Sequence, residues 1–272
     1  MDASRWFRGP VAITGASGQV GTALQKRLAD LPNEVRALGR DDQLEAAFRG
    51  VDVVVHLAGT LAPKRPNTYR AANLTTVEAT VNVLRGSEAK RVVFLSYVDA
   101  DPTSRNPYLR YKGQAEELLG DSETPAVILR STHILGTPDE PGPTVAAMLS
   151  KDGKPVSVLG PGTQRYAWVA RDDVAEGIVR AALDPDAPIG TFELAGPKAE
   201  GVDDFVRHIN GEAVRMRHLA PLAARLMGRL LPSLPSPLVD VMLRDSLPLG
   251  GAPDAAERLG LRMRTLGEMW RP

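Results

Sequence analysis

Two side chains four residues apart are suited to exchanging a proton with a substrate. Tyr108 and Lys112 lie in the segment NPYLRYK (106–112), and residues four apart share one face of a helix. A nearby ammonium group stabilises a phenolate, so the lysine is expected to lower the pKa of the phenol from about 10. Such a tyrosine can give a proton to a carbonyl oxygen or take one from an alcohol. The alternative is an ordinary exposed helix pair.

A hydroxyl group precedes this pair at the end of an apolar run. Ser96 follows VVFL (92–95), a pattern typical of a buried strand, and only residues 97–107 separate it from Tyr108. A serine there could hydrogen-bond the same substrate oxygen that the tyrosine protonates. We therefore expect Ser96 and the tyrosine–lysine pair to face one crevice.

A glycine-rich segment near the amino end is suited to holding phosphate. TGASGQVG (14–21) follows an apolar run and precedes a helical pattern, which is the context of dinucleotide-binding turns. Glycine lets backbone N–H groups approach a pyrophosphate, and the helix N-terminus adds its dipole. The spacing is G-x-x-G-x-x-G rather than G-x-G-x-x-G, and a turn without a ligand is the alternative. The residues expected at the cofactor are Gly15, Ser17, Gly18, Gln19, Val20 and Gly21.

Arginines at the second predicted strand favour NADP over NAD. Arg40 ends the segment EVRALGR (34–40), where the adenosine ribose is expected, and Arg36 lies upstream. A guanidinium group binds phosphate through two hydrogen bonds, as the 2′-phosphate of NADP requires. NAD stays possible, because both arginines could be surface residues while Asp41 or Asp42 binds the ribose hydroxyls.

The elements that position these groups alternate along the first half of the chain. The pattern predicts βαβ units and a Rossmann-type, doubly wound parallel sheet of the α/β class, covered on both faces. After about Gly136, clustered Gly and Pro predict a smaller, mostly helical C-terminal substrate lobe. We expect a dinucleotide-binding domain at 1–136 and the lobe at 137–272, with 156–195 partly returning to the sheet domain. Strands are expected at 11–14, 34–38, 53–57, 91–95, 126–129 and 191–194, and helices at 20–30, 43–49, 71–84, 108–119 and 172–183.

Composition excludes several classes of protein. The 272 residues contain 33 Lys+Arg and 33 Asp+Glu, so the net charge of zero argues against a dedicated binder of nucleic acid or of a membrane surface. Zero Cys excludes disulfides, thiolate zinc sites and a cysteine nucleophile, and four His without metal-like spacing indicate no metal site. The apolar stretch 219–243 is broken by Pro and Arg, so no membrane span is expected. The sequence favours a cytoplasmic monomer or homodimer acting on a small molecule.

Together these segments resemble the short-chain dehydrogenase/reductase superfamily, in its extended or atypical branch, which includes relatives of a complex I accessory subunit. The resemblance implies that Leu57, Ala58 and Gly59 line an NAD(P) cofactor, that Asn73 lies on the cofactor side, and that Ser131 and His133 flank the nicotinamide. It is carried by the glycine turn, VDVVVHLAG (51–59), AANLTTVEATVNVL (71–84), KRVVFLS (90–96), YLRYK (108–112), VILRSTHILG (127–136), WVARDDVAEGIVRAAL (168–183) and FELAGP (192–197).

The resemblance also implies roles for the reactive groups. Ser96 would bind the substrate oxygen, Tyr108 would exchange the proton, and Lys112 would additionally hold the nicotinamide ribose. Two departures stand out. Residues 40–42 run directly into the next helix, which shortens the adenine pocket and weakens the argument for NADP, and Tyr97 replaces the usual second serine.

Other residues have a structural and a functional interpretation. His56 fits an interior or cofactor-adjacent position, and His133 could meet substrate. Asp172 and Asp173 resemble a structural junction between the lobes, and Tyr166 with Trp168 fits packing between them. The arginines between 215 and 229 form either a solvated face or a site for an anionic substrate. A core, or the lid of an apolar pocket, is indicated by Leu222, Leu226, Met227, Leu230 and Leu231.

The sequence favours an NAD(P)-dependent oxidoreductase that passes hydride between the nicotinamide and a carbonyl or alcohol carbon. One alternative is a non-catalytic NADP(H)-binding sensor or assembly factor, which would need no Tyr108. Another is a sugar-nucleotide epimerase or dehydratase with tightly bound NAD. The proline-rich C-terminal lobe shows no evident arginine cluster for a second diphosphate, which disfavours that reading.

Overall fold

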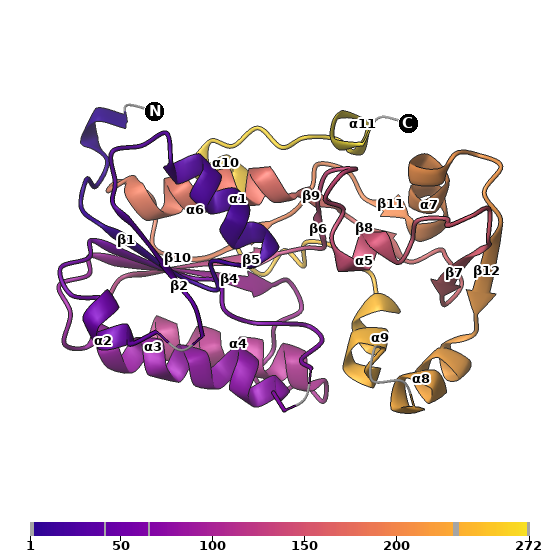
Figure 1. Cartoon of the computed structure of the whole chain (residues 1–272), viewed down its shortest axis with the longest axis horizontal. Helices are drawn as coiled ribbons and strands as arrows, with labels where there is room; N and C mark the ends of the chain where they lie inside the picture. The colour runs from indigo at the N-terminus through magenta and orange to yellow at the C-terminus, as the bar shows by residue number, and fades with distance from the viewer. Residues whose placement is uncertain (1–2, 41, 65, 231–233, 271–272) are drawn as a thin grey trace.

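Residues 3–40, 42–64, 66–230 and 234–270 are described by the computed structural model of the chain (Figure 1). Asp41 and Leu231, named above, lie outside the described residues, as do the side chains of Met227, Arg229 and Leu230. None of the helices in the described parts has the length and apolar character needed to cross a bilayer.

A parallel sheet of six strands forms the centre, as the sequence predicts. The strand order is β10-β5-β4-β3-β1-β2. From β1 the chain adds β2 on one side, and it then crosses to add β3 on the other side of β1. This reversal leaves a crevice beyond the carboxyl ends of β1 and β3. The strands are β1 (Val11–Thr14), β2 (Val35–Leu38), β3 (Val53–His56), β4 (Arg91–Tyr97), β5 (Ala126–Ser131) and β10 (Gly190–Leu194).

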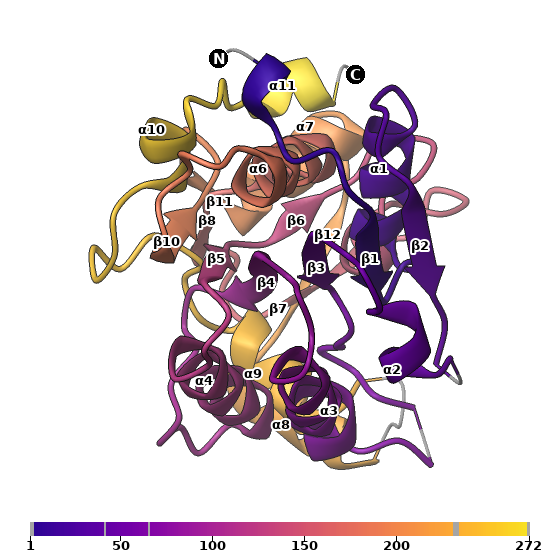
Figure 2. The ribbon, with the colours of Figure 1, turned by 90° about the vertical axis from the view of Figure 1, so that its left-hand side faces the viewer.

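Alternating side chains of the strands fill two cores, one on each face of the sheet. Val53 and Val55 pack on the face that α1 and α6 cover, whereas Val54 packs on the opposite face with α3 and α4. All three valines are fully buried, which explains the unbroken apolar run in the sequence. Figure 2 shows the two helical layers on either side of the sheet. The helices are α1 (Gln19–Leu28) and α6 (Arg171–Leu183) on one face, and α2 (Leu44–Ala47), α3 (Thr76–Leu84) and α4 (Pro107–Gly120) on the other.

The C-terminal lobe combines short helices with three two-stranded sheets. Its core is aromatic: Trp168 stacks on Phe205 at 4.3 Å between ring centroids, and Tyr166 is fully buried beside them. The paired strands are β6 (Ile134–Leu135) with β9 (Val169–Ala170), β7 (Val156–Leu159) with β12 (Met216–Leu219), and β8 (Arg165–Tyr166) with β11 (Glu200–Gly201). The helices are α5 (Pro143–Ala146), α7 (Val202–Asn210), α8 (Pro221–Leu230) and α9 (Ser236–Met242). The expected domain boundary near 136 stays a prediction.

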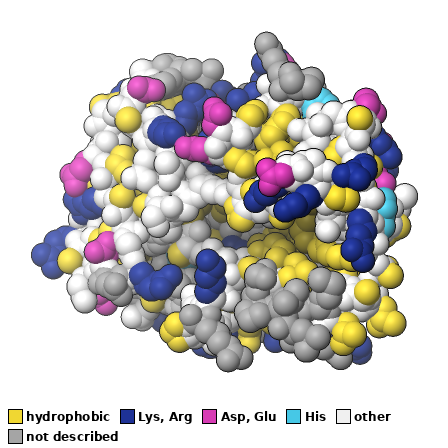
Figure 3. Space-filling model, turned by 45° about the vertical axis from the view of Figure 1, so that its right-hand side comes forward, with side chains coloured by type: hydrophobic (Ala, Val, Ile, Leu, Met, Phe, Trp, Pro, Cys, Tyr) yellow, Lys and Arg dark blue, Asp and Glu magenta, His cyan; other side chains and the backbone are white. Residues whose placement is uncertain are grey.

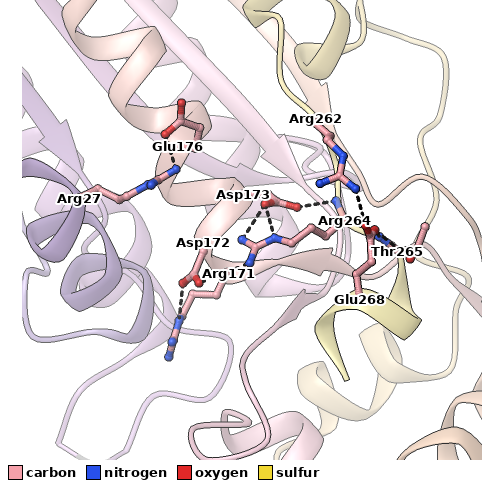
Figure 4. Close-up of polar contacts among 9 residues, drawn as sticks. All are labelled: Arg27, Arg171, Asp172, Asp173, Glu176, Arg262, Arg264, Thr265 and Glu268. Carbon is pink, nitrogen blue, oxygen red and sulfur yellow. Dashed lines mark hydrogen bonds and ion pairs between the residues drawn. The ribbon is translucent and has the colours of Figure 1, made fainter. Parts of the chain in front are cut away.

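Charged contacts tie the last part of the chain to the start of α6. After α10 (Ala255–Leu259) and before α11 (Leu266–Met269), Arg264 donates its backbone N–H and its Nε to the two carboxylate oxygens of Asp173, both at 2.8 Å. Arg27 of α1 pairs with Glu176 of α6 at 2.6 Å, so α6 is held from two sides (Figure 4). Asp173 is therefore a structural residue, as the sequence suggested.

Candidate cofactor and active site

A cavity of about 460 Å³ opens at the carboxyl ends of β1, β3, β4 and β5. It brings together segments from the amino end of the chain to residue 144, and Figure 3 shows a hollow with a largely hydrophobic wall on this side of the molecule. Of the predicted site residues, its wall contains Gly15, Gly18, Gln19, Val20, Gly21, Leu57, Gly59, Ser96, Tyr108, Lys112, Ser131 and His133. Ser17, Arg40, Ala58 and Asn73 are not part of this wall.

The glycine turn needs its glycines for two physical reasons. Gly15 adopts φ +70°, and a Cβ there would lie 2.6 Å from the backbone N of Ala58. A Cβ on Gly21 would lie 2.6 Å from the carbonyl oxygen of Ala16. The turn therefore packs directly on the chain that follows β3. Since Gly18 caps α1 without a side-chain hydrogen bond, the first N–H groups of the helix are left for a ligand such as a pyrophosphate.

The start of α4 fixes Tyr108 in the wall of the cavity. The side chain of Asn106 accepts a hydrogen bond from the backbone N–H of Tyr108 at 3.0 Å, and Pro107 occupies the first helical position. Lys112 lies one turn later and is only 6 % exposed; its Nζ donates to the carbonyl oxygen of Leu95 at 2.7 Å. The helix thus delivers both side chains to the crevice next to the end of β4.

Burial controls the acidity of both groups. Burial raises the pKa of the Tyr108 phenol, with the nearby Tyr69 as a smaller contribution. Burial lowers the pKa of the Lys112 ammonium to about 8, against an opposing attraction from Glu116. The expectation that Lys112 lowers the phenol pKa is therefore wrong for this arrangement, because loss of solvation outweighs any gain from the ammonium. Lys112 therefore still carries its proton below about pH 8 but loses it at a lower pH than an exposed lysine would.

Two buried polar atoms of the cavity-lining residues lack a partner. Ser96 is 4 % exposed and its Oγ makes no hydrogen bond within the described chain. The same holds for Nε2 of His133, whose side chain is 6 % exposed and whose pKa burial lowers to about 4. Buried polar groups are nearly always paired in proteins, so unpaired ones beside a cavity fit a ligand that completes them. The bare glycine turn and these two atoms together fit a dinucleotide with a polar substrate group beside it.

Asn73 acts on the site through the backbone rather than from the cavity wall. It is fully buried, and its Nδ2 donates to the carbonyl oxygens of Thr60 at 3.0 Å and Tyr69 at 3.1 Å. Its Oδ1 accepts from the N–H of Thr60 at 3.0 Å. Asn73 lies in a π-helical turn at 71–75, and its amide holds the chain just after Gly59. A Cβ added at Gly59 would lie 3.3 Å from Nζ of Lys112, so this part of the chain passes close to the lysine.

The two arginines of the second strand differ in availability. Arg36 donates through Nε to Glu34 at 2.7 Å and through Nη1 to the carbonyl oxygens of Ala47 and Arg49, so three of its five N–H donors are used within the chain. Arg40 is exposed beyond the end of β2 and makes no hydrogen bond or ion pair with the described part of the chain. The carboxylate of Asp42 accepts the N–H of Gly39 at 2.6 Å. Of these two arginines, Arg40 has the guanidinium without a hydrogen-bond partner in the described chain.

Sequence reasoning missed part of the wall. Residues 141–144, which lead into α5 and form its first turn, lie against the glycine turn: Gly142 adopts φ +85°, and a Cβ there would lie 2.7 Å from Oε1 of Gln19. Tyr97 also lines the cavity, with its hydroxyl 3.1 Å from Oγ of Ser246. The Gly and Pro residues clustered after Gly136 indicated a change of pattern but not which part of the chain they would contact, and nothing local points to residue 246. His56 lies outside this wall, 3.0 Å from Thr80 Oγ1, and burial lowers its pKa to about 3, as suits an interior histidine.

Comparisons with known proteins agree with this geometry. The model of the NAD dependent epimerase/dehydratase family matches residues 11–195, more than half of the chain. A ceramide reductase of Caulobacter vibrioides is 26% identical over 216 residues, covering 71% of this chain and 67% of its own. The subunit 9 of the NADH dehydrogenase 1 alpha subcomplex of Arabidopsis thaliana is 27% identical over 225 residues, covering 72% of this chain. The chain spans only about half of that relative's length, 54%.

Solved structures share the fold. MoeE5 in complex with UDP-glucose and NAD superposes with a TM-score of 0.73 at 19% identity, covering 96% of both chains. UDP-glucuronic acid 4-epimerase of Bacillus cereus, in complex with UDP-glucuronic acid and NAD, gives 0.70 at 17% identity and 94% of both chains. At such identities the likeness concerns the fold alone. From the family match and the fold together, the chain belongs to the NAD dependent epimerase/dehydratase family, within the extended short-chain dehydrogenases/reductases.

Proposed function

We propose that the chain is an NAD(P)-dependent oxidoreductase that interconverts a carbonyl and an alcohol on a small, uncharged and largely apolar substrate. The observation that carries the proposal is the single cavity shared by the glycine turn and by Ser96, Tyr108 and Lys112. A cofactor-binding turn alone would suit any dinucleotide protein. A buried phenol and a buried amine at the same crevice are the groups that proton exchange with a substrate oxygen requires.

In the reducing direction each side chain has a defined task. When bound, a reduced nicotinamide supplies the hydride to the carbonyl carbon. Ser96 Oγ donates a hydrogen bond to the carbonyl oxygen, which satisfies its unpaired hydroxyl. Tyr108 gives its phenolic proton to that oxygen as negative charge develops there. Lys112, with its pKa at about 8, stabilises the resulting phenolate and hands on the proton that restores it.

The electrostatics of the cavity bear on the substrate. Lys112 carries the sole charged side chain among the described residues of the wall. The glycine turn can accommodate the cofactor's diphosphate through backbone N–H groups, but a second diphosphate would find no cationic side chain in this wall other than Lys112. A nucleotide sugar is therefore disfavoured as substrate. The named ceramide reductase and a UDP-sugar reductase of Pseudomonas aeruginosa, 31% identical over 46% of this chain, are both reductases by name.

For the cofactor we propose NADP with NAD as the weaker ligand. Arg40 is exposed at the end of β2, where the adenosine ribose is expected, and has no competing contact within the described chain. Its guanidinium is free to pair with a 2′-phosphate. Residues 40–42 run directly into the next helix, so Arg40 is the residue that carries this preference.

The test follows NADPH consumption by the purified protein with a panel of apolar aldehydes and ketones. Tyr108→Phe is expected to lower kcat by about 10²–10⁴-fold while the dissociation constant of NADPH is unchanged. Tyr111→Phe, on the same helix but outside the cavity wall, should keep wild-type turnover. Full activity of Tyr108→Phe with a good substrate would refute the assignment. Isomerised product without net cofactor consumption would indicate an epimerase, and tight binding without any turnover a sensor.

A further inference from the structure

Helix α8 carries an apolar face that no described part of the chain covers. Leu222 and Leu226 are 80% and 57% exposed, and their spacing of four places them on one side of the helix. Single exposed leucines are ordinary on protein surfaces, but two neighbours one turn apart form a contiguous patch.

The orientation of this helix is fixed by its opposite side. Ala224 and Gly228 are buried, and α8 packs against α9 there. A Cβ on Gly228 would lie 3.0 Å from the carbonyl oxygen of Leu234 and 3.1 Å from Cα of Ser236. Because only small residues fit this contact, the leucines cannot turn inward, and their exposure is built into the packing.

The segment that contains α8 is locally basic, in a chain whose net charge is zero. Residues 213–239 contain four Arg and one His but no Asp or Glu. Arg217 on β12 is exposed, and the ion pairs of the described residues give it no acidic partner. Two acids approach the segment from outside: Asp240 pairs with Arg225 at 2.9 Å, and Asp203 with His218 at 2.8 Å. With its right-hand end turned forward, the molecule shows hydrophobic side chains at the lower right and Lys and Arg side chains along the edge above them (Figure 3).

This part of the lobe is attached directly to the candidate active site. Val241 of α9 is buried in one cluster with Tyr97 and Tyr108. The side chain of Asn106, which caps α4, also donates to the carbonyl oxygen of Pro237 at 2.9 Å. Figure 1 shows α8 and α9 side by side at the same end of the molecule as the carboxyl ends of the strands. A surface that engages α8 therefore lies close to the entrance of the crevice.

We propose that α8 docks on the surface of a lipid bilayer that contains anionic lipid, through a patch of Leu222, Leu226, Arg217 and Arg225. The leucines would enter the boundary between headgroups and acyl chains, and the arginines would contact lipid phosphates. A chain-wide charge of zero argues against a surface binder only when the charges are evenly spread. A second copy of the chain is a poorer occupant, since a two-fold contact would place like-charged arginines against each other.

Vesicle flotation tests the proposal without reading any enzyme activity. The wild-type protein should float with vesicles of phosphatidylcholine and phosphatidylglycerol, less with phosphatidylcholine alone, and less at high salt. The double variant Leu222→Ser, Leu226→Ser should lower the vesicle partition coefficient at least about tenfold, as expected from the loss of two inserted apolar side chains. Ile189→Ser is the matched control. This residue is an exposed hydrophobic residue (49%) just before the edge strand β10 and lies outside α8.

Charge-reversal variants separate the electrostatic contribution to vesicle binding from the contribution of the inserted leucines. Arg217→Glu should abolish the preference for phosphatidylglycerol. Arg85→Glu should not, because Arg85 is exposed just after α3 and before β4, at the end of the molecule away from α8. The proposal is overturned if the wild-type protein floats with neither vesicle, if the leucine variant floats as well as the wild type, or if the leucines instead hold a dimer that the variant dissociates. Flotation does not measure turnover, so neither result bears on the proposed oxidoreductase activity, which the NADPH assay of Tyr108→Phe tests separately.

Discussion

The buried amine of Lys112 should make the stability of the protein depend on pH in a way that a surface lysine does not. Burial lowers its pKa from 10.5 to about 8 in the folded chain. Between these values the unfolded chain binds more protons than the folded one, so the free energy of unfolding rises with pH. The full shift corresponds to about 3 kcal/mol, of which about 2 kcal/mol should be gained between about pH 7 and pH 9.5. Below pH 8 the whole penalty is present.

Urea unfolding of the wild type and of Lys112→Met at both pH values measures this difference. The free energy of unfolding of the wild type should rise by about 2 kcal/mol more than that of the variant. Comparing the two proteins cancels the other titrating groups, including the tyrosines. Lys90→Met is the matched control, since Lys90 is half exposed and paired with Asp52 at 2.8 Å; its pH dependence should follow the wild type. Equal pH dependence of the wild type and Lys112→Met would refute the claim that this amine is buried and poorly solvated.

Three further changes test other parts of the argument. Gly21→Ala places a Cβ 2.6 Å from the carbonyl oxygen of Ala16, so it should weaken NADPH binding in calorimetry by at least about tenfold; unchanged affinity would remove the glycine turn from the cofactor site. Arg40→Ala should raise the dissociation constant of NADPH about tenfold and leave that of NADH unchanged, and equal effects on both would refute the phosphate contact. Asp173→Asn breaks a largely buried pair with Arg264 and should cost about 1–3 kcal/mol of unfolding free energy, with cofactor affinity preserved in the folded protein.

The sheet domain could be predicted because its signals are local. A short β-branched run such as 53–57 is typical of a strand buried on both faces, and a glycine turn between a strand and a helix has few alternatives. The predicted parallel, doubly wound sheet is confirmed. The lobe was harder: its strands β6, β8, β9 and β11 have two residues each, too short to leave a periodic pattern.

Which side chains of the site are free to bind a ligand depends on contacts between residues far apart in the sequence. Arg36 was a second basic residue near the position expected for the phosphate, but it donates to carbonyl oxygens at and just after the end of α2. The hydroxyl of Tyr97 meets Ser246, which lies 149 positions later. The residue spacing within one helix or strand cannot predict these hydrogen bonds, because tertiary packing decides which donors bind other parts of the chain and which remain free.

Burial of the side chains explains the pKa shifts in the site, and the sequence alone could not predict it. The pKa of Lys112 and that of His133 both move down, and that of Tyr108 moves up, so each group is pushed toward its neutral form. Spacing alone suggested a phenol acidified by an ammonium; packing produces instead a neutral, poorly solvated site. In such a site any charge that appears during reaction is unfavourable unless a neighbour compensates it at once. A phenolate on Tyr108 is therefore tolerable only while Lys112 carries its proton, so turnover that depends on Tyr108 should fall as pH rises through about 8, where this lysine becomes neutral.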